Sequence, residues 1–436
     1  MSSALDRLGP PAADFGRFVA RVGGPRRLVV QPRMGMSVPS TMREGLLATR
    51  RAAAATAGTI TLDSYTRMGQ HHAARRALAD GVALNGYPLV AHSPATTQEV
   101  LAGVLDADFQ VQVRHGTADP QDIFRVMGKV GLNASEGGPV SYCLPYGRTP
   151  LAEAVTNWER SCELLAESST RPHLETFGGC MMGQLCPPSL LIAISLLEGL
   201  FFVRHGVRSI SLSYAQQTHP EQDAEAIHAL RRLADELFAG IDWHVVLYTY
   251  MGMYPETAAG ARLLLANAVQ LAMRSGVERL IVKTEAESSR IPTIAENVAA
   301  LEQADAVART HREVARRPVD TGIYSEAAAL VEAVRNLHPD VGRALVIAFR
   351  MGYLDVPFCL HPDNQGQARG ALADDGRLVW ARVGSMPIAL DSTRREVQMT
   401  ASGLLSSLSY VRRKFDHDAL SALDGQLRSC PDQVDA

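Results

Sequence analysis

One short stretch of the chain, residues 133–146 (NASEGGPVSYCLPY), combines side chains that could bind a charged ligand. It places the carboxylate of Glu136 near two phenols, Tyr142 and Tyr146. The glycines and prolines between them fix a backbone path and do not extend a helix. A carboxylate on such a loop can bind an ammonium group while the tyrosines shape a pocket. Taken alone, the stretch fits a surface turn with two packing tyrosines better.

Three arginines that precede this stretch favour the binding interpretation. Arg33, Arg67 and Arg114 each come at or just after the end of a predicted strand. One arginine in such a place usually forms a structural ion pair, and burying several without partners is costly. Guanidinium groups bind carboxylates and phosphates through two parallel hydrogen bonds. Three arginines beside Glu136 therefore predict a small substrate with two acid groups and one amine.

The sequence offers little that could act as acid-base machinery. No Ser-His-Asp order, catalytic carboxylate pair or group of histidines stands out, and we predict no metal ligands in this chain. Lys283, at a predicted strand end, could form a Schiff base, whereas Glu287 would suit the binding of hydroxyl groups. A site that binds a charged diacid without acid-base groups of its own suggests that a cofactor performs the chemistry.

The elements that must position these residues alternate between strand-like and helix-like patterns. Such alternation predicts a parallel α/β fold, and its length favours a (β/α)8 TIM barrel over an open sheet. No Gly-x-Gly-x-x-Gly or Walker loop supports a nucleotide-binding Rossmann domain. A barrel needs eight strands, so one of our nine candidates must lie outside it. The candidates are residues 27–32, 58–63, 84–91, 109–114, 132–136, 173–177, 209–214, 243–248 and 279–283.

We expect an N-terminal arm with a short helix over residues 1–25, the barrel as catalytic domain over 26–325, and a C-terminal α+β appendage over 326–436. The longest apolar run, residues 190–203, contains Glu198 and is shorter than the ~20 residues of a membrane span, so it predicts a buried helix. A net charge of −3 gives no excess of positive charge for nucleic acid or membrane surfaces. Six cysteines without a paired framework, and no recognisable signal peptide, predict a cytoplasmic protein.

An ordered series of motifs resembles the catalytic epsilon (E) subunit of glutamate mutase, also called methylaspartate mutase. The resemblance implies an adenosylcobalamin-dependent isomerase on a (β/α)8 barrel. Its reaction interconverts L-glutamate and (2S,3S)-3-methylaspartate by radical fragmentation and recombination of the carbon skeleton. The motifs are QPRMGM, TLDSYTR, LNGYP, QVRHGT, EGGPVSYCLPY, MGMYP, VKTEAE and IPT within residues 30–293, followed by LDVPF at 354–358.

The resemblance also assigns roles to residues of this sequence. Arg33, Arg67 and Arg114 would hold the substrate carboxylates, with His115 adding to the same grip. Glu136 would pair with the substrate ammonium. The positions implied for the remaining contacts are Tyr142 and Tyr146 at the substrate, Gly35, Thr61, Asn85, Pro145 and Tyr254 near the corrin, and Lys283, Glu287 and Ile291 at the adenosyl group.

The resemblance further implies a partner. In this class a small sigma (S) subunit carries Asp-x-His-x-x-Gly, whose histidine is the lower cobalt ligand, and this chain contains no such hexapeptide. We therefore expect a separate cobalamin-binding subunit, in a heterotetramer built through an E-subunit homodimer. Three alternatives stay open: the same chemistry on a related amino diacid in secondary metabolism, a catalytically idle binding subunit, and a Schiff-base aldolase that uses Lys283.

Overall fold

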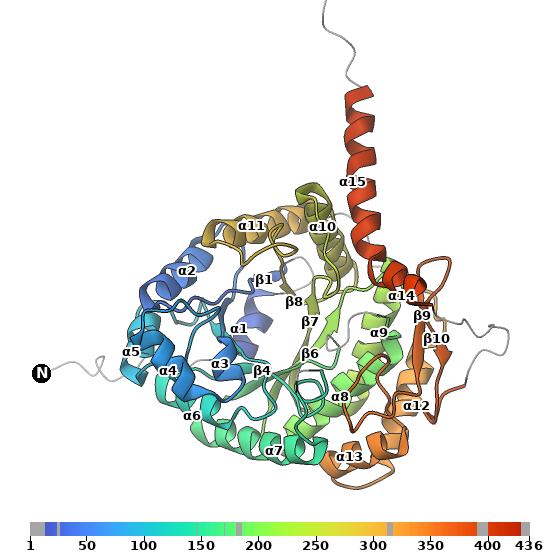
Figure 1. The fold of residues 1–436 in the computed structure, drawn as a ribbon, viewed down its shortest axis with the longest axis horizontal. Helices are drawn as coiled ribbons and strands as arrows, with labels where there is room; N and C mark the ends of the chain where they lie inside the picture. Colours follow the sequence, from blue (N-terminus) through green and yellow to red (C-terminus); the bar gives the residue numbers. More distant parts are fainter. Residues whose placement is uncertain are drawn as a thin grey trace, which may run out of the picture.

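Eight parallel strands form the closed barrel that the sequence predicts, with helices around it (Figure 1). The computed structural model describes residues 14–23, 27–145, 147–169, 171–179, 185–311, 317–389 and 400–428. The hydrogen-bonded strand order is β1-β8-β7-β6-β5-β4-β3-β2. A parallel bridge between Val30 and Thr56 joins the two ends of this order and closes the barrel. The strands are β1 (Val29–Gln31), β2 (Gly58–Thr61), β3 (Val111–Arg114), β4 (Ala134–Gly137), β5 (His173–Thr176), β6 (Ser209–Ala215), β7 (Asp242–Tyr248) and β8 (Arg279–Ile281).

The candidate at residues 84–91 is the one of the nine that lies outside the barrel, and it forms no strand. Within the described part of the chain it contributes one isolated bridge, between Leu62 and Tyr87. The backbone at Gly86 lies so close to Leu62 and Asp63 that an added Cβ would overlap their main-chain atoms. The segment therefore extends the end of β2 as a close-packed turn.

The helices follow one another in chain order, and most of them cover the outside of the barrel, as expected for alternating strands and helices. They are α1 (Phe15–Val22), α2 (Pro39–Arg51), α3 (Ser64–Arg67), α4 (His71–Ala79), α5 (Pro94–Leu101), α6 (Gln121–Val130), α7 (Leu151–Ser168), α8 (Pro188–Arg204), α9 (Pro220–Leu237), α10 (Ala258–Arg274), α11 (Ile294–Thr310), α12 (Ile323–Arg335), α13 (Val341–Met351), α14 (Ala401–Leu408) and α15 (Tyr410–Arg428).

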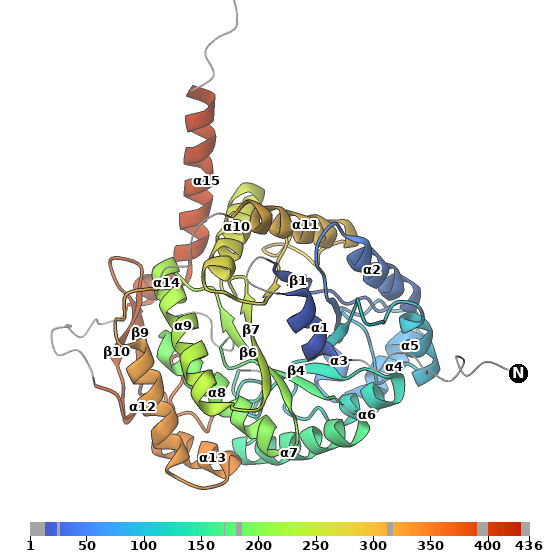
Figure 2. The same cartoon turned by 180° about the vertical axis from the view of Figure 1, so that it is seen from behind.

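Helix α1 is the short helix predicted near the N-terminus, and it packs beneath the barrel (Figure 2). Its apolar residues Phe15, Phe18 and Val19 are buried against Val29 of β1 and neighbouring strand residues. The Phe15 ring lies 5.0 Å from the guanidinium carbon of Arg279 in β8. Because this helix closes the end where the strands begin, the opposite end remains for the site.

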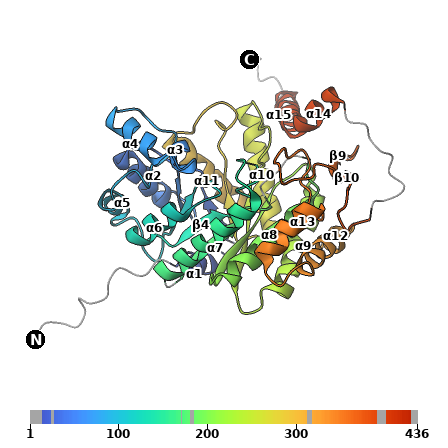
Figure 3. The same ribbon diagram turned by 60° about the horizontal axis from the view of Figure 1, so that its bottom comes forward.

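Helix α8 contains the long apolar run and is buried along nearly all of its length, as predicted. Among the described residues, no helix is both long and apolar enough to cross a membrane. Helices α12 and α13 lie outside α8, and an antiparallel hairpin of β9 (Arg369–Leu372) and β10 (Leu378–Arg382) follows them. Figure 3 shows this hairpin, α14 and α15 on the same side of the barrel as α10.

Candidate active site

The strongest contact of the predicted site joins the ends of β3 and β4. Arg114 Nε donates a hydrogen bond to Glu136 Oε2 at 2.7 Å, and both side chains are almost fully buried. The hydroxyl of Tyr142 donates to the other carboxylate oxygen, and Tyr248 Oη, at the end of β7, lies 2.8 Å from Glu136 Oε2. Burial works against the charged form of Arg114, but the neighbouring Glu136, Tyr248 and Tyr142 outweigh it and raise its pKa.

His115 is neutral and belongs to an aromatic cluster. Its ring stacks on Trp158 with centroids 5.8 Å apart and meets Tyr142 edge-on at 5.1 Å. Burial, followed by the charges of Arg114 and Arg67, lowers the pKa of His115 to about 3, although the backbone of Glu136 acts in the opposite direction. His115 therefore lies beside the arginines as an uncharged aromatic side chain, and it does not add a fourth positive charge.

Arg67 lies at the last position of the one-turn helix α3, which Asp63 caps through the backbone N–H of Thr66. Its Nη2 donates to Ser64 Oγ at 3.3 Å. At this site two buried guanidinium atoms have no hydrogen-bond acceptor among the described residues: Nε of Arg67 and Nη1 of Arg114. A cavity of about 440 Å³ is lined by Arg67, by Tyr142, which contacts Glu136, and by residues 116–119 among others. Unused donors next to a cavity are what an anionic ligand requires.

Arg33 belongs to a second group, built around Glu287. One carboxylate oxygen of Glu287 accepts from Arg33 Nη1 at 2.8 Å and lies 3.0 Å from Lys283 Nζ. Lys283 is buried, with Nζ 5.1 Å from the centre of the Tyr254 ring. Burial lowers the pKa of Lys283 to about 8, against the opposing effect of Glu287. The three arginines predicted to hold the substrate carboxylates, which we call the claw arginines, thus belong to two subsites. One is centred on Glu136 and the other on Glu287.

The other predicted contacts lie around the rim of the same mouth. Gly35 approaches the carbonyl of Thr61 so closely that any side chain would overlap it. Asn85 is exposed and accepts a hydrogen bond from the Ser64 backbone at 3.0 Å. Pro145 is half-buried and Ile291 is exposed, while Tyr146 lies outside the described residues.

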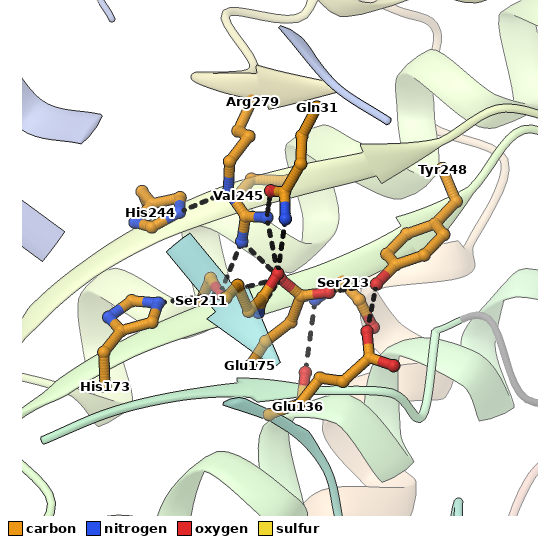
Figure 4. A network of polar contacts seen from close by, with 12 residues as sticks. Gln31, Glu136, His173, Glu175, Ser211, Ser213, His244, Val245, Tyr248 and Arg279 are labelled. Atoms are coloured by element: carbon orange, nitrogen blue, oxygen red, sulfur yellow. Dashed lines mark hydrogen bonds and ion pairs between the residues drawn. The ribbon is translucent and has the colours of Figure 1, made fainter. Parts of the chain in front are cut away.

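A buried polar network beneath the site was missed by sequence reasoning (Figure 4). Glu175 of β5 and Arg279 of β8 form an ion pair with no solvent exposure, and Gln31 Oε1 accepts from Arg279 Nη1 at 2.6 Å. The Tyr248 hydroxyl contacts both Glu175 and Glu136, so the network reaches the site itself. Glu175 and Arg279 are charged residues inside predicted buried strands, and that signal could have identified them.

Breaking this buried pair is expected to be strongly destabilising. In Arg279→Met the Glu175 charge loses its cation, and we expect the free energy of unfolding to fall by about 3–5 kcal/mol. Urea denaturation of the wild type and the variant measures this fall in the free energy of unfolding. The double variant Arg279→Met/Glu175→Leu should be more stable than Arg279→Met, because no uncompensated charge remains. Equal stability of the two variants would contradict this account.

Comparison with known protein families identifies the family of this chain. A family model described as methylaspartate mutase E chain (MutE) matches residues 10–402 of the sequence. The chain belongs to the methylaspartate mutase E chain family. Several relatives carry the name glutamate mutase epsilon subunit. The one from Halobacterium salinarum is 32% identical over 399 residues, covering 87% of this chain and 82% of the relative.

Two further relatives with that name show similar coverage. The protein from Haloarcula marismortui is 32% identical, with 73% of this chain and 68% of the relative covered. The protein from Escherichia coli O157:H7 is 30% identical, with 76% and 72% covered. Membership in the methylaspartate mutase E chain family makes this chain a mutase subunit, and its Arg114–Glu136 pair lies where a TIM barrel carries its active site.

Proposed function

We propose that this chain is the catalytic subunit of an adenosylcobalamin-dependent glutamate mutase. The reaction would interconvert L-glutamate and (2S,3S)-3-methylaspartate by radical fragmentation and recombination of the carbon skeleton. The observation that carries the proposal is the buried Arg114–Glu136 pair with unused guanidinium donors beside it. This arrangement offers separate partners for the acid and amine groups of one small molecule.

The charge balance of the site supports an amino diacid. Its cations are Arg33, Arg67, Arg114 and Lys283, and its anions are Glu136 and Glu287. Two more cations than anions leave room for two substrate carboxylates, while Glu136 can accept the ammonium group. Nη1 of Arg114 and Nε of Arg67 would each gain the acceptor that the described residues do not provide.

Burial of the site supports radical chemistry, which requires that water be kept away from reactive intermediates. Arg114, Glu136 and Tyr142 are each at most 5% exposed. The aromatic rings of His115, Trp158 and Tyr142 pack against one another beside this pair. A substrate bound against the Arg114–Glu136 pair would thus react in a fixed geometry.

The residues at the second subsite fit the proposed cofactor. Tyr254 Oη and Thr61 Oγ1 are buried and have no hydrogen-bond partner within the described ranges, so a ligand with polar groups could satisfy them. Gly35 keeps the rim near Thr61 free of a side chain. We expect Lys283 and Glu287 to hold hydroxyl groups of the adenosyl moiety. When bound, adenosylcobalamin supplies the radical that removes a hydrogen atom from the substrate.

We also propose a separate small sigma (S) subunit that provides the lower cobalt ligand, since the sequence lacks Asp-x-His-x-x-Gly. The assembly would be a heterotetramer built through an E-subunit homodimer, located in the cytoplasm. Product analysis by NMR tests the whole proposal: L-glutamate is incubated with this chain, adenosylcobalamin and the small subunit. We expect 3-methylaspartate to form when all three components are present, and not when any one is left out.

The alternatives give different results in the same experiment. The claw arginines and Glu136 would contact only the acid and amine groups of the substrate, so a related amino diacid would fit them too. If such a compound is the true substrate, it would give product where glutamate gives none. An idle binding subunit would form no product from either. For a Schiff-base aldolase, borohydride reduction with a carbonyl substrate would trap Lys283; we expect no adduct, because Lys283 is paired with Glu287.

The pH dependence of cofactor binding follows from the lowered pKa of Lys283. Below about pH 8 its amine is protonated and pairs with Glu287, whose own pKa is lowered because Lys283 and Arg33 outweigh its burial. Above that pH the amine is neutral and the charged contact is lost. We expect the affinity for adenosylcobalamin, measured with the small subunit by absorbance titration, to fall by roughly tenfold as pH rises through about 8. Lys283→Met should show no such step; a step of equal size in that variant would contradict the assignment.

A further inference from the structure

Glu198 of α8 is a buried carboxylate that lies next to the site without being part of it. Its side chain has no solvent exposure, and no ion pair to it is present in the described part of the chain. Backbone N–H groups surround it instead. Its Oε1 accepts from Val140 at 3.1 Å and Ser141 at 2.8 Å, and its Oε2 from Phe177 at 3.4 Å and Gly178 at 3.1 Å.

These four donors come from two different loops at the mouth of the barrel. Val140 and Ser141 follow β4 and directly precede Tyr142, whereas Phe177 and Gly178 follow β5. One carboxylate therefore fastens the loop after β4 to the loop after β5. A buried carboxylate is costly unless each oxygen is fully hydrogen-bonded, and here both oxygens are.

The loop sequence is adapted to this contact. An added Cβ at Gly138 would overlap the Glu198 carboxylate, so the glycine leaves the space that the carboxylate occupies. Burial raises the pKa of Glu198 to about 7, while the hydrogen bonds from the Ser141, Val140 and Phe177 backbone act to lower it. The carboxyl is therefore ionised mainly above about pH 7, where N–H dipoles from the two loops stabilise its charge.

The contact continues into the site through aromatic rings. The Phe177 ring lies 5.1 Å from the Tyr142 ring and 5.5 Å from the Tyr248 ring, measured between centroids. Both tyrosine hydroxyls contact the carboxylate of Glu136. A shift of either loop would therefore move the two phenols that surround Glu136.

We propose that Glu198 is a positioning residue: by binding both loops it sets the places of Tyr142, Phe177 and Tyr248 around Glu136, and so fixes the substrate's amine subsite. The role for substrate rests on the proposed function, while the fastening of the loops does not. Glu198→Gln tests it, because the amide nitrogen is a donor and cannot accept from the N–H groups of one of the two loops.

Two measurements at pH 8 separate positioning from stability. Hydrogen–deuterium exchange of the chain alone should show lost protection in peptides covering residues 138–142 and 177–178, with other core peptides unchanged. In the complex with adenosylcobalamin and the small subunit, kcat/KM for L-glutamate should fall by about 100-fold, the size expected for a misplacement of about 1 Å. KM itself should rise, whereas a variant that is merely less stable has fewer active molecules and an unchanged KM.

Glu225→Gln is the matched control. Glu225 is also a buried helical glutamate, on α9, and accepts from the backbone of Thr321 at 2.7 Å and of Ile323 at 3.4 Å, on the outside of the barrel. Glu225→Gln should leave hydrogen–deuterium exchange in both loops, and the KM for L-glutamate, at wild-type values. Should Glu198→Gln not fold, Glu198→Asp keeps the charge but shortens its reach, and a smaller effect in the same peptides is expected.

Unchanged exchange in both loops of the Glu198 variant would overturn the proposal, and so would altered exchange with an unchanged KM. If wild type shows no activity with glutamate, the proposed function fails, and the exchange experiment still decides whether Glu198 fastens the loops.

Discussion

Replacement of Arg114 by lysine should lower kcat/KM for L-glutamate by roughly 100-fold, equivalent to about 3 kcal/mol of lost transition-state stabilisation. Arg114 Nε is committed to Glu136 at 2.7 Å, and its Nη1 lacks an acceptor within the described residues. A lysine ammonium can replace one of these contacts but not both, because it cannot present a planar fork of donors. Substrate binding and the Glu136 contact would therefore compete for one cation.

Steady-state kinetics of the complex measure this prediction, and Arg160→Lys serves as the matched control. Arg160 lies on the surface of α7 and pairs with Glu163 three residues later, so the same change there should be without effect. A wild-type KM and kcat in Arg114→Lys would remove Arg114 from the substrate site. Loss of activity in both Arg114→Lys and Arg160→Lys would indicate a fault in the protein preparation and not an effect on the substrate site.

The barrel and the strand-end residues could be predicted because both depend on local sequence. Alternation of apolar strands and helices needs no knowledge of distant contacts, and Arg33, Arg67 and Arg114 stand where apolar segments give way to polar ones. The same reliance on local sequence made residues 84–91 a strand candidate. Tyr87, Leu89 and Val90 have strand-forming side chains, but Gly86 and the β2 end come together in space as a turn, which a local pattern does not reveal.

Pairings between distant segments could not be predicted. Arg33 follows β1 and contacts Glu287, which follows the paired strand β8, so an arginine expected to hold substrate is tied to the predicted adenosyl subsite. The Glu175–Arg279 pair lies inside the barrel, where side chains of alternate strands meet in layers. Periodicity identifies an inward-facing position, but which inward residues become neighbours depends on register, such as the alignment of Glu136 with Glu175 between β4 and β5.

Replacement of Glu136 by glutamine should have the second large effect, a fall in kcat/KM of roughly 100-fold or more. Every polar contact of Glu136 that we describe comes from a donor: Arg114 Nε and the hydroxyls of Tyr142 and Tyr248. A glutamine offers one accepting oxygen and one donating nitrogen, so at least one tyrosine hydroxyl must turn round to accept, or lose its contact. Loss of the charge also leaves the Arg114 guanidinium buried without its anion.

A glutamate analogue that lacks the amine distinguishes the effect of Arg114→Lys from that of Glu136→Gln. Glutarate has both carboxylates of glutamate but no ammonium group, so as a competitive inhibitor it reports the carboxylate contacts alone. In Glu136→Gln the KM for glutamate should rise while the inhibition constant of glutarate stays the same or falls, because the repelling carboxylate has gone. In Arg114→Lys both values should rise together. If Glu136→Gln weakens glutarate as much as glutamate, the charge of Glu136 does not select the amine, and its function is then to hold Arg114 in place.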